Sequence, residues 1–164
     1  MADAEAGRRI VLAMFDAGVE FIVVGGTAAV IMGAPIVTFD VDIVHRRSAE
    51  NVDRLHAFLM QHGAYHRLDL ANRRLPPARD VLFGHGHLNL ALGDAKLDVL
   101  CELDAGAGYD ELLEDSELQP FHGKMLRVLG LRRLIQAKTA AGRLKDQMAL
   151  PILLATLEAR EHGK

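Results

Sequence analysis

The sequence predicts an α/β (α+β) fold in which a mixed β-sheet is flanked by helices. Helical and strand-like segments alternate in the first half of the chain, and two strand-like segments then flank Gly93-Asp94, a typical hairpin turn. Two helical segments end the chain. With 164 residues, half of them hydrophobic, the chain is expected to form a single domain over 1–164, with a core over about 17–130 and a C-terminal helical segment over about 131–164.

Helices and strands of the first part follow from local patterns. Apolar residues at helical spacing predict a helix over Glu5–Ala17, which Gly18 would end. A short β-branched run predicts a strand over Glu20–Val24. The Ala-rich segment Thr27–Met32 predicts a short helix that stops at Gly33.

The next segments alternate between regular and irregular structure. Asp and apolar residues alternate over Phe39–Val44, which is the period of a strand. Ser48 is a good N-cap for a helix that runs to about His62. The polar segment Arg67–Asp80 contains Pro76-Pro77 and predicts a loop.

The second half predicts three strands and two helices. The predicted strands are His87–Leu92, Lys96–Glu102 and Lys124–Leu129, and the predicted helices are Leu131–Ala141 and Asp146–Arg160, with breaks around Gly142 and Pro151. The acidic segment Asp110–Glu117 is expected to be a solvated turn or helix.

Composition excludes several classes of protein. A single cysteine, Cys101, excludes an internal disulfide and a multi-cysteine metal site. The net charge of −3 argues against a uniformly basic nucleic-acid binder, although local Arg/Lys stretches surround an acidic one. Phe21–Phe39 is free of charge, but glycines and Pro35 interrupt it, so no membrane span is expected. The start lacks the pattern of a signal peptide, and we expect a cytoplasmic protein.

Three aspartates form the candidate catalytic set. Asp40 and Asp42 are two residues apart in a strand, so their side chains point to one face. Charges that close repel each other, and a divalent cation removes that conflict. Asp98 lies between apolar neighbours in another predicted strand and would supply a third carboxylate to a two-metal site, in preference to the nearby Asp94 and Asp104.

A glycine turn precedes these aspartates. Gly25-Gly26 follows the first strand and opens a helix, so backbone N–H groups are expected to face a phosphate there. Thr27 would add a hydroxyl group. The order of strand, Gly-Gly, short helix and strand-borne Asp-x-Asp therefore favours an active site over a chance packing turn.

The chain resembles the nucleotidyltransferase superfamily with the polymerase-β-like fold, and within it the minimal nucleotidyltransferases that include AbiEii-type toxins. The matching stretches are VVGGTAAVIMG, VTFDVDIV, KLDVL and LRRLIQAKTAAGRLKD. The resemblance implies transfer of a nucleoside monophosphate from an NTP to an acceptor hydroxyl, with Mg²⁺ or alternatively Mn²⁺ as the cation. It implies that Gly25 and Gly26 grip phosphate, that Asp40 and Asp42 bind the metal holding the NTP, and that Asp98 shares the second metal and activates the acceptor.

The resemblance also assigns roles near the C-terminus. Lys138, Lys145 and Asp146 match a Lys and a Lys-Asp pair that the family places near the nucleotide, with Arg143 alongside. Because positions five apart lie about 140° apart around a helix, Lys138 is the preferred phosphate contact and Arg143 the second. Ile36 departs from the pattern, since relatives often carry Arg two residues before the Thr of this stretch.

Several functional alternatives stay open at this point. The acceptor could be RNA, such as a tRNA end, a protein or a small molecule. The protein could act as a toxin silenced by an antitoxin partner. Because of Ile36, it could instead be a nucleotide-binding module without catalysis, or a partner-regulated binding protein.

Overall fold

The computed structural model describes residues 2–163 and is built on one mixed sheet of seven strands in the order β3-β4-β5-β2-β1-β7-β6. In chain order the strands are β1 (Phe21–Val24), β2 (Asp40–His45), β3 (Tyr65–His66), β4 (His87–Leu92), β5 (Ala95–Leu100), β6 (Ser116–Phe121) and β7 (Lys124–Leu129). This arrangement confirms the predicted fold class.

The sheet combines parallel and antiparallel strand pairs. β1 runs antiparallel to β2 and parallel to β7, and β2 runs parallel to β5. The pairs β4–β5 and β6–β7 are antiparallel hairpins. The central strands β1, β2 and β5 therefore lie side by side although β5 follows β2 by fifty residues.

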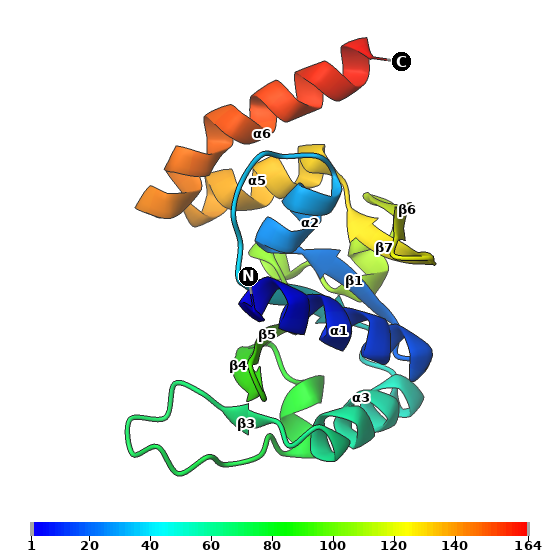
Figure 1. The fold of residues 1–164 in the computed structure, drawn as a ribbon, viewed down its shortest axis with the longest axis vertical. Helices are drawn as coiled ribbons and strands as arrows, with labels where there is room; N and C mark the ends of the chain where they lie inside the picture. The colour runs from blue at the N-terminus through cyan, green and yellow to red at the C-terminus, as the bar shows by residue number, and fades with distance from the viewer. Residues whose placement is uncertain (1, 164) are drawn as a thin grey trace.

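Helices pack on the sheet, and the C-terminal helices project beyond it at one end of the molecule (Figure 1). They are α1 (Ala2–Asp16), α2 (Gly25–Ile31), α3 (Ala49–Gln61), α4 (Tyr109–Leu112), α5 (Leu131–Ala141) and α6 (Leu144–His162), with short 3₁₀ turns η1 (Arg79–Phe83) and η2 (Asp104–Gly106). α1 packs against β5 and β2, whereas α2 packs against β2 and β1. α5 contacts α2, and α6 lies mainly on α5, further from the sheet.

Two hairpin segments and the end of the first helix confirm their sequence signals. Both β4 and β7 have the predicted bounds, and β4 and β5 are joined by Gly93-Asp94, where Gly93 has a φ of 58°. Gly18 follows α1 with a φ of 78°, the left-handed conformation expected of a glycine at this place.

Three expectations from the sequence need correction. The acidic segment predicted over Asp110–Glu117 divides into the short α4 and the start of β6, an edge strand that the sequence pattern did not show. The predicted loop Arg67–Asp80 follows β3, and its last two residues belong to η1; neither element was anticipated. Pro151 does not break α6, which runs through it from Leu144 to His162, because buried Leu153 holds the following turn against the core.

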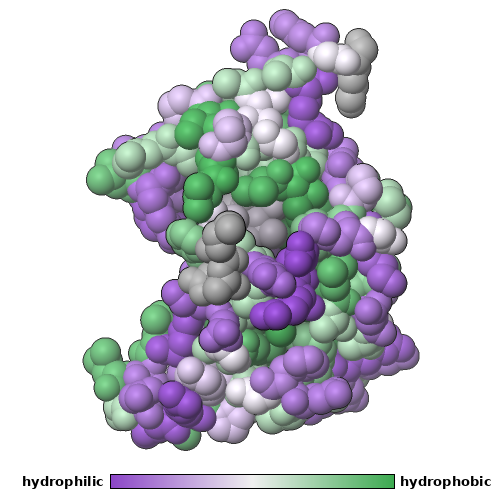
Figure 2. Space-filling view, viewed as in Figure 1, coloured by the Kyte–Doolittle hydropathy of each residue, from purple (hydrophilic) through white to green (hydrophobic). Residues whose placement is uncertain are grey.

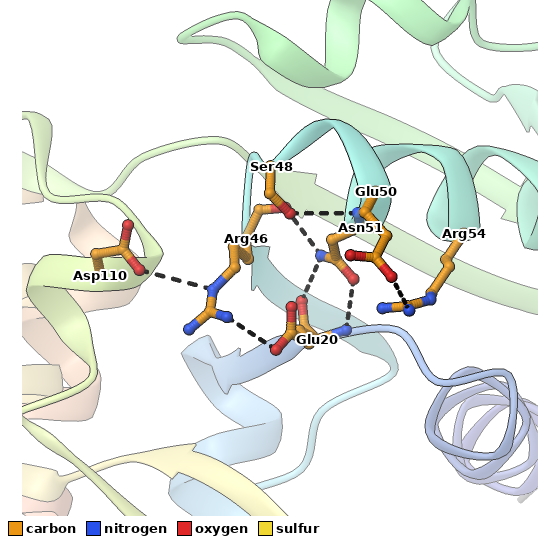
Figure 3. A network of polar contacts seen from close by, with 7 residues as sticks. All are labelled: Glu20, Arg46, Ser48, Glu50, Asn51, Arg54 and Asp110. Carbon is orange, nitrogen blue, oxygen red and sulfur yellow. Dashed lines mark hydrogen bonds and ion pairs between the residues drawn. The ribbon is translucent and has the colours of Figure 1, made fainter.

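A polar network ties the entry of β1 to the exit of β2 (Figure 3). The side chain of fully buried Asn51, in the first turn of α3, accepts from the Glu20 N–H at 2.7 Å and donates to the carbonyls of Glu20 and Arg46 at 2.9 and 2.8 Å. Ser48 caps α3 by accepting from the Asn51 N–H. The network fixes the strand pair that carries Asp40 and Asp42.

The uncharged segment 21–39 is part of the globular body. It forms β1, α2 and the connection to β2. None of the helices within residues 2–163 has the length and apolar character needed to cross a membrane.

Candidate active site

The Gly25-Gly26 turn lies directly against the aspartate strand. Asp42 is the register partner of Val24, the last residue of β1, so the following Gly25 meets the Asp42 side chain. A Cβ at position 25 would overlap Oδ2 of Asp42, and Gly25 has a φ of 62°. A Cβ at position 26 would lie 2.9 Å from Oγ1 of Thr38. Both positions therefore require glycine for the turn to approach β2 this closely.

Asp98 joins the other two aspartates on one face of the sheet. Asp42 and Asp98 are register partners on the parallel strands β2 and β5, so their side chains share a face, and Asp40 lies two residues along on that face. Asp98 is also the register partner of Asn89 on β4. The sheet thus brings together the three carboxylates that the sequence singled out.

The shared environment changes the acid–base behaviour of Asp42. Burial first, and then the nearby charge of Asp98, a hydrogen bond with Asp98 and the charge of Asp40, raise the pKa of Asp42 to about 8, while Lys138 works in the opposite direction. Without a bound cation the Asp42 carboxyl therefore carries a proton at neutral pH.

Arg67 contacts the carboxylates from the side of β3. Its Nη1 donates to Oδ1 of Asp98 at 2.6 Å and to the carbonyl of Leu90 at 3.1 Å. Its Nη2 donates to Oδ2 of Asp40 at 3.5 Å. One guanidinium thus bridges two of the three aspartates.

The donor set suits a hard divalent cation. Across residues 2–163, no three His, Cys, Asp or Glu side chains are gathered as a ready metal-binding group, and two of the aspartates are turned toward Arg67 instead. Carboxylate oxygens are nevertheless the donors that Mg²⁺ and Mn²⁺ prefer. The missing Cβ at Gly25 keeps the space beside Oδ2 of Asp42 clear of protein. The residues therefore fit the group that the fold implies.

A cavity of about 750 Å³ opens over these side chains. It lies between the sheet and the C-terminal helices, where the molecular outline is indented in Figure 2. Its walls include most of the predicted site residues, namely Gly25, Gly26, Asp40, Asp42, Asp98, Lys138, Arg143 and Lys145. This volume is within the range of small-molecule sites.

The cationic wall of the cavity is held by a buried carboxylate. Asp146 is fully buried and accepts from Lys138 Nζ at 3.3 Å and from Arg143 Nε at 2.7 Å. Burial would raise the pKa of Asp146, but the Arg143 hydrogen bond and the Lys138 charge outweigh it and lower that pKa. Asp146 thus stays ionised and orients both cations.

The structure does not place every predicted residue in the wall of the cavity. Thr27 does not line the cavity, and its hydroxyl donates to the carbonyl of Asp40 at 3.0 Å, which links α2 to β2. Ile36 lines the cavity and presents an apolar side chain there. Of the two alternative acids, Asp94 lies exposed in the hairpin turn, whereas Asp104 lines the cavity and pairs with Arg133 at 2.9 Å.

Sequence reasoning missed two cavity residues and the bridging arginine. Thr38 was noted only as part of a motif, and its hydroxyl donates to the Asp40 carbonyl at 3.3 Å beside Gly26. His87 also lines the cavity. Arg67 lay in a segment predicted as a loop, and its role depends on the path of that loop, which no local pattern reveals.

Comparison with solved structures identifies the fold. A protein of Thermotoga maritima described as a nucleotidyltransferase superposes with a TM-score of 0.58 at 17% identity, covering 90% of this chain and 91% of that chain. The chain has the nucleotidyltransferase fold. The antibiotic-resistance factor ANT(2'')-Ia, solved in complex with adenylyl-2''-tobramycin, gives a TM-score of 0.64 at 16% identity and covers 98% of this chain and 92% of its own. Its solution structure gives 0.63 at 14% identity, with coverages of 95% and 86%.

The similarity in fold is not accompanied by a match in sequence. No family model matches the chain, and no curated protein sequence matches it. The similarity to nucleotidyltransferases is therefore one of three-dimensional fold, at sequence identities below one fifth.

Proposed function

We propose that this protein is a nucleotidyltransferase that moves a nucleoside monophosphate from an NTP to an acceptor hydroxyl group. The observation that carries the proposal is the contact between the Gly25 turn and Asp42, on a face that also holds Asp40 and Asp98. That arrangement combines space for a phosphate with three carboxylates, and the nucleotidyltransferase fold adds support.

The cavity residues divide into two functional groups. Asp40, Asp42 and Asp98 would hold Mg²⁺ or Mn²⁺, which supplies neutralisation of the phosphate charge and stabilises the entering and leaving oxygens. Lys138, Arg143 and Lys145, on the opposite wall, would bind the triphosphate oxygens. Gly25 and Gly26 let a phosphate approach the backbone closely.

In the proposed reaction one bond to the α-phosphorus forms as another breaks. The acceptor oxygen forms a bond to the α-phosphorus, and the bond from that phosphorus to the β-phosphate oxygen breaks, so pyrophosphate leaves. The Asp98 carboxylate takes the proton of the acceptor hydroxyl. Lys138 and Arg143, fixed by Asp146, offset the negative charge that passes to pyrophosphate.

Label transfer tests the activity directly. Purified protein would be incubated with each α-³²P-NTP, with Mg²⁺ or Mn²⁺, and with total RNA, total protein or small hydroxylated acceptors. We expect transfer by the wild type, loss of transfer in Asp40→Asn and Asp42→Asn, and no loss in Asp94→Asn, whose carboxylate lies outside the cavity. Equal transfer by the wild type and the Asp42→Asn protein would overturn the proposal.

A second candidate is nucleotide binding without catalysis. Ile36 lines the cavity where relatives often carry a cation, which favours this alternative. Calorimetry with each NTP, with and without Mg²⁺, combined with pyrophosphate release, separates the two. Binding without pyrophosphate release, over all acceptors, would favour the inactive module.

A third candidate, which rests on the resemblance to AbiEii-type toxins alone, is a toxin that acts in the cytoplasm and is silenced by an antitoxin protein. Modification of an essential RNA end would stop growth. Expression of the wild type is then expected to arrest growth, and expression of Asp40→Asn is not. Normal growth with active wild-type protein would exclude the toxin role while leaving the enzymatic proposal intact.

A further inference from the structure

Arg67 lies where it can compete with a divalent cation. The side chain is largely enclosed, with 16% of its surface exposed, and it donates to Oδ1 of Asp98 at 2.6 Å and toward Oδ2 of Asp40 at 3.5 Å. These are oxygens that a cation shared by the two aspartates would use. A hydrogen bond of 2.6 Å to a carboxylate is short and charge-assisted.

Two hydrogen bonds to backbone carbonyls of β4, one from the Arg67 backbone and one from its side chain, hold Arg67 in position. Its backbone N–H donates to the carbonyl of Asn89 at 3.0 Å, which extends the pairing of β3 with β4. Its Nη1 also donates to the carbonyl of Leu90 at 3.1 Å. The guanidinium is therefore anchored at the edge of the carboxylate cluster and does not simply reach in from solvent.

The cluster of three carboxylates favours a positively charged side chain at the position of Arg67. Three carboxylates, those of Asp40, Asp42 and Asp98, share one face of the sheet. Arg67 contacts two of them, Asp98 and Asp40. Lys138 and Arg143, two of the cations that line the cavity, are bound to Asp146 instead.

Resting on the proposed function, we propose that Arg67 is a built-in counter-ion that divalent metal must displace from Asp98 and Asp40. In the metal-free protein Arg67 neutralises these carboxylates and keeps the strands together. When a divalent cation binds, the guanidinium gives up the bond to Asp98 and keeps its anchor at Leu90. Metal affinity is thereby lowered, and the free cleft is protected from binding metal without nucleotide.

Binding of Mn²⁺ in the absence of nucleotide tests this inference. Mn²⁺ affinity would be measured by electron paramagnetic resonance and by calorimetry for the wild type, Arg67→Gln and Arg73→Gln. Arg73 is the matched control, because it lies on the same loop and pairs with Asp69 at 3.0 Å, away from the three aspartates. Both substitutions remove one positive charge; Arg67→Gln removes the ion pairs with Asp98 and Asp40, and Arg73→Gln removes the ion pair with Asp69.

The two arginine variants are expected to differ. Removing a unit charge about 6 Å from a divalent cation in a water-like environment should tighten binding about tenfold in Arg67→Gln. Arg73→Gln should change the Mn²⁺ affinity by less than about twofold, because exposed charges are screened beyond about 10 Å. Arg67→Lys, which keeps the charge and loses the two-aspartate bridge, should lie between the wild type and Arg67→Gln. Unchanged or weaker Mn²⁺ binding in Arg67→Gln would overturn the inference.

A measurement on the wild type keeps the test valid if Arg67→Gln fails to fold. The side-chain N–H resonances of Arg67 would be followed by NMR during titration with Mg²⁺. We expect slowly rotating Nη groups that lose their distinct signals as Mg²⁺ binds, while the Arg73 signals stay in place. An Arg67 signal that does not move at saturating Mg²⁺ would contradict displacement.

The outcomes also separate this inference from the proposed function. A wild type that transfers label and binds Mn²⁺ while Arg67→Gln shows no tighter binding would remove only the role of Arg67. A wild type that binds no divalent cation, with or without NTP, and transfers no label would remove both.

Discussion

A Cβ on residue 25 would overlap Oδ2 of Asp42 and lie 2.9 Å from its Cγ. The turn that ends β1 and the acid on β2 are therefore in van der Waals contact, and any side chain at position 25 must displace the acid. This contact makes the Gly-Gly turn and the carboxylates one structural unit.

We predict that Gly25→Ala is both inactive and destabilised. Gly25 and Gly93 have similar positive φ values of 62° and 58°, but only Gly25 has a side chain in the way, since nothing lies within 4 Å of a Cβ at Gly93. Gly93→Ala should cost about 1–2 kcal/mol of unfolding free energy from backbone strain alone. Gly25→Ala should cost about 1–3 kcal/mol more because of the overlap.

Urea denaturation of both variants and label transfer would measure the difference. Introducing Asp42→Ala into the Gly25→Ala protein removes the overlapping side chain, so the second substitution should restore part of the stability without restoring transfer. Equal stability of the Gly25→Ala and Gly93→Ala proteins would show that the acid yields without cost.

Asp42→Asn is expected to abolish transfer while stabilising the metal-free protein at alkaline pH. The pKa of Asp42 is raised to about 8 by burial and by its acidic neighbours, so the folded protein binds this proton more tightly than the unfolded chain does. Stability from this group is complete below the unfolded pKa of about 4 and is lost as pH rises through about 8. An amide has no such dependence.

Urea midpoints in EDTA at pH 6 and pH 9 would check this expectation. The wild type should lose more stability over that interval than Asp42→Asn, and Asp94→Asn should follow the wild type. A parallel decline of all three proteins would show that another group controls the alkaline limb.

His45 should make the protein sensitive to mild acid. The buried ring bonds to the carbonyl of Leu82 through Nε2 at 2.7 Å, and its Nδ1 is buried without a hydrogen-bond partner. Burial, together with the positive charge of Arg47, lowers the pKa of His45 below 6.5, against the opposing effect of the Leu82 bond. Because the unfolded chain binds this proton more readily, stability should fall as pH drops below about 6.5.

Denaturation midpoints between pH 7.5 and pH 5 would measure the effect. His45→Gln keeps a donor for Leu82 and removes the titrating ring, so its midpoint should fall less than that of the wild type. His162→Gln, at the exposed end of α6, is the matched control and should retain the full acid dependence. The same acid dependence in His45→Gln and the wild type would assign the sensitivity to other groups.

Asn51→Ala should destabilise the protein without altering its chemistry. The substitution leaves the Glu20 N–H and the Arg46 carbonyl without their side-chain partner beneath α3, as Figure 3 shows. The loss of all three side-chain hydrogen bonds of Asn51 predicts a decrease of about 2–4 kcal/mol in unfolding free energy. Ser48→Ala removes only the helix cap and should cost about 1 kcal/mol.

Thermal and urea unfolding would rank these two variants, and label transfer at low temperature would follow the folded fraction. A similar loss from both would mean that water replaces the Asn51 contacts. A loss of transfer in a fully folded Asn51→Ala protein would place the network in the site itself.

Local patterns in the sequence predicted those strands that alternate between a buried and an exposed face, and those that end at a glycine turn. The hairpin around Gly93-Asp94 is of this kind. β6 was missed because it is an edge strand with no buried residue and with an internal Pro120, so it lacks a regular hydrophobic alternation. The role of Asn51 was not predicted, because its partners Glu20 and Arg46 meet it only through tertiary structure.

The candidate site shows the same division. Strand parity predicted that Asp40 and Asp42 share a face, and an apolar context favoured Asp98 over its acidic neighbours; the register of β2 with β5 brings all three together. Arg67 could not be predicted, because its contact with Asp98 spans 31 residues and depends on where β3 joins the edge of β4.

Asp146 is fully buried and holds two side chains of the cationic wall of the cavity, Lys138 and Arg143. Lys138 Nζ and Arg143 Nε lie 3.3 and 2.7 Å from its oxygens. Asp146→Asn keeps the size of the side chain but removes the charge that orients these cations. If they bind the triphosphate, NTP binding should weaken by about tenfold, in line with the loss of one charge-assisted contact, while Mn²⁺ binding without nucleotide stays unchanged.

Calorimetry with a non-hydrolysable NTP, paired with Mn²⁺ titration, would separate those two readouts. Glu158→Gln, an exposed acid on the same helix, is the matched control for the change of charge and should bind NTP as the wild type does. The pair Lys138→Met and Asp146→Asn should be less than additive, because Asp146 acts through Lys138. Unaltered NTP binding in Asp146→Asn would place the triphosphate elsewhere in the cavity, away from α5 and α6.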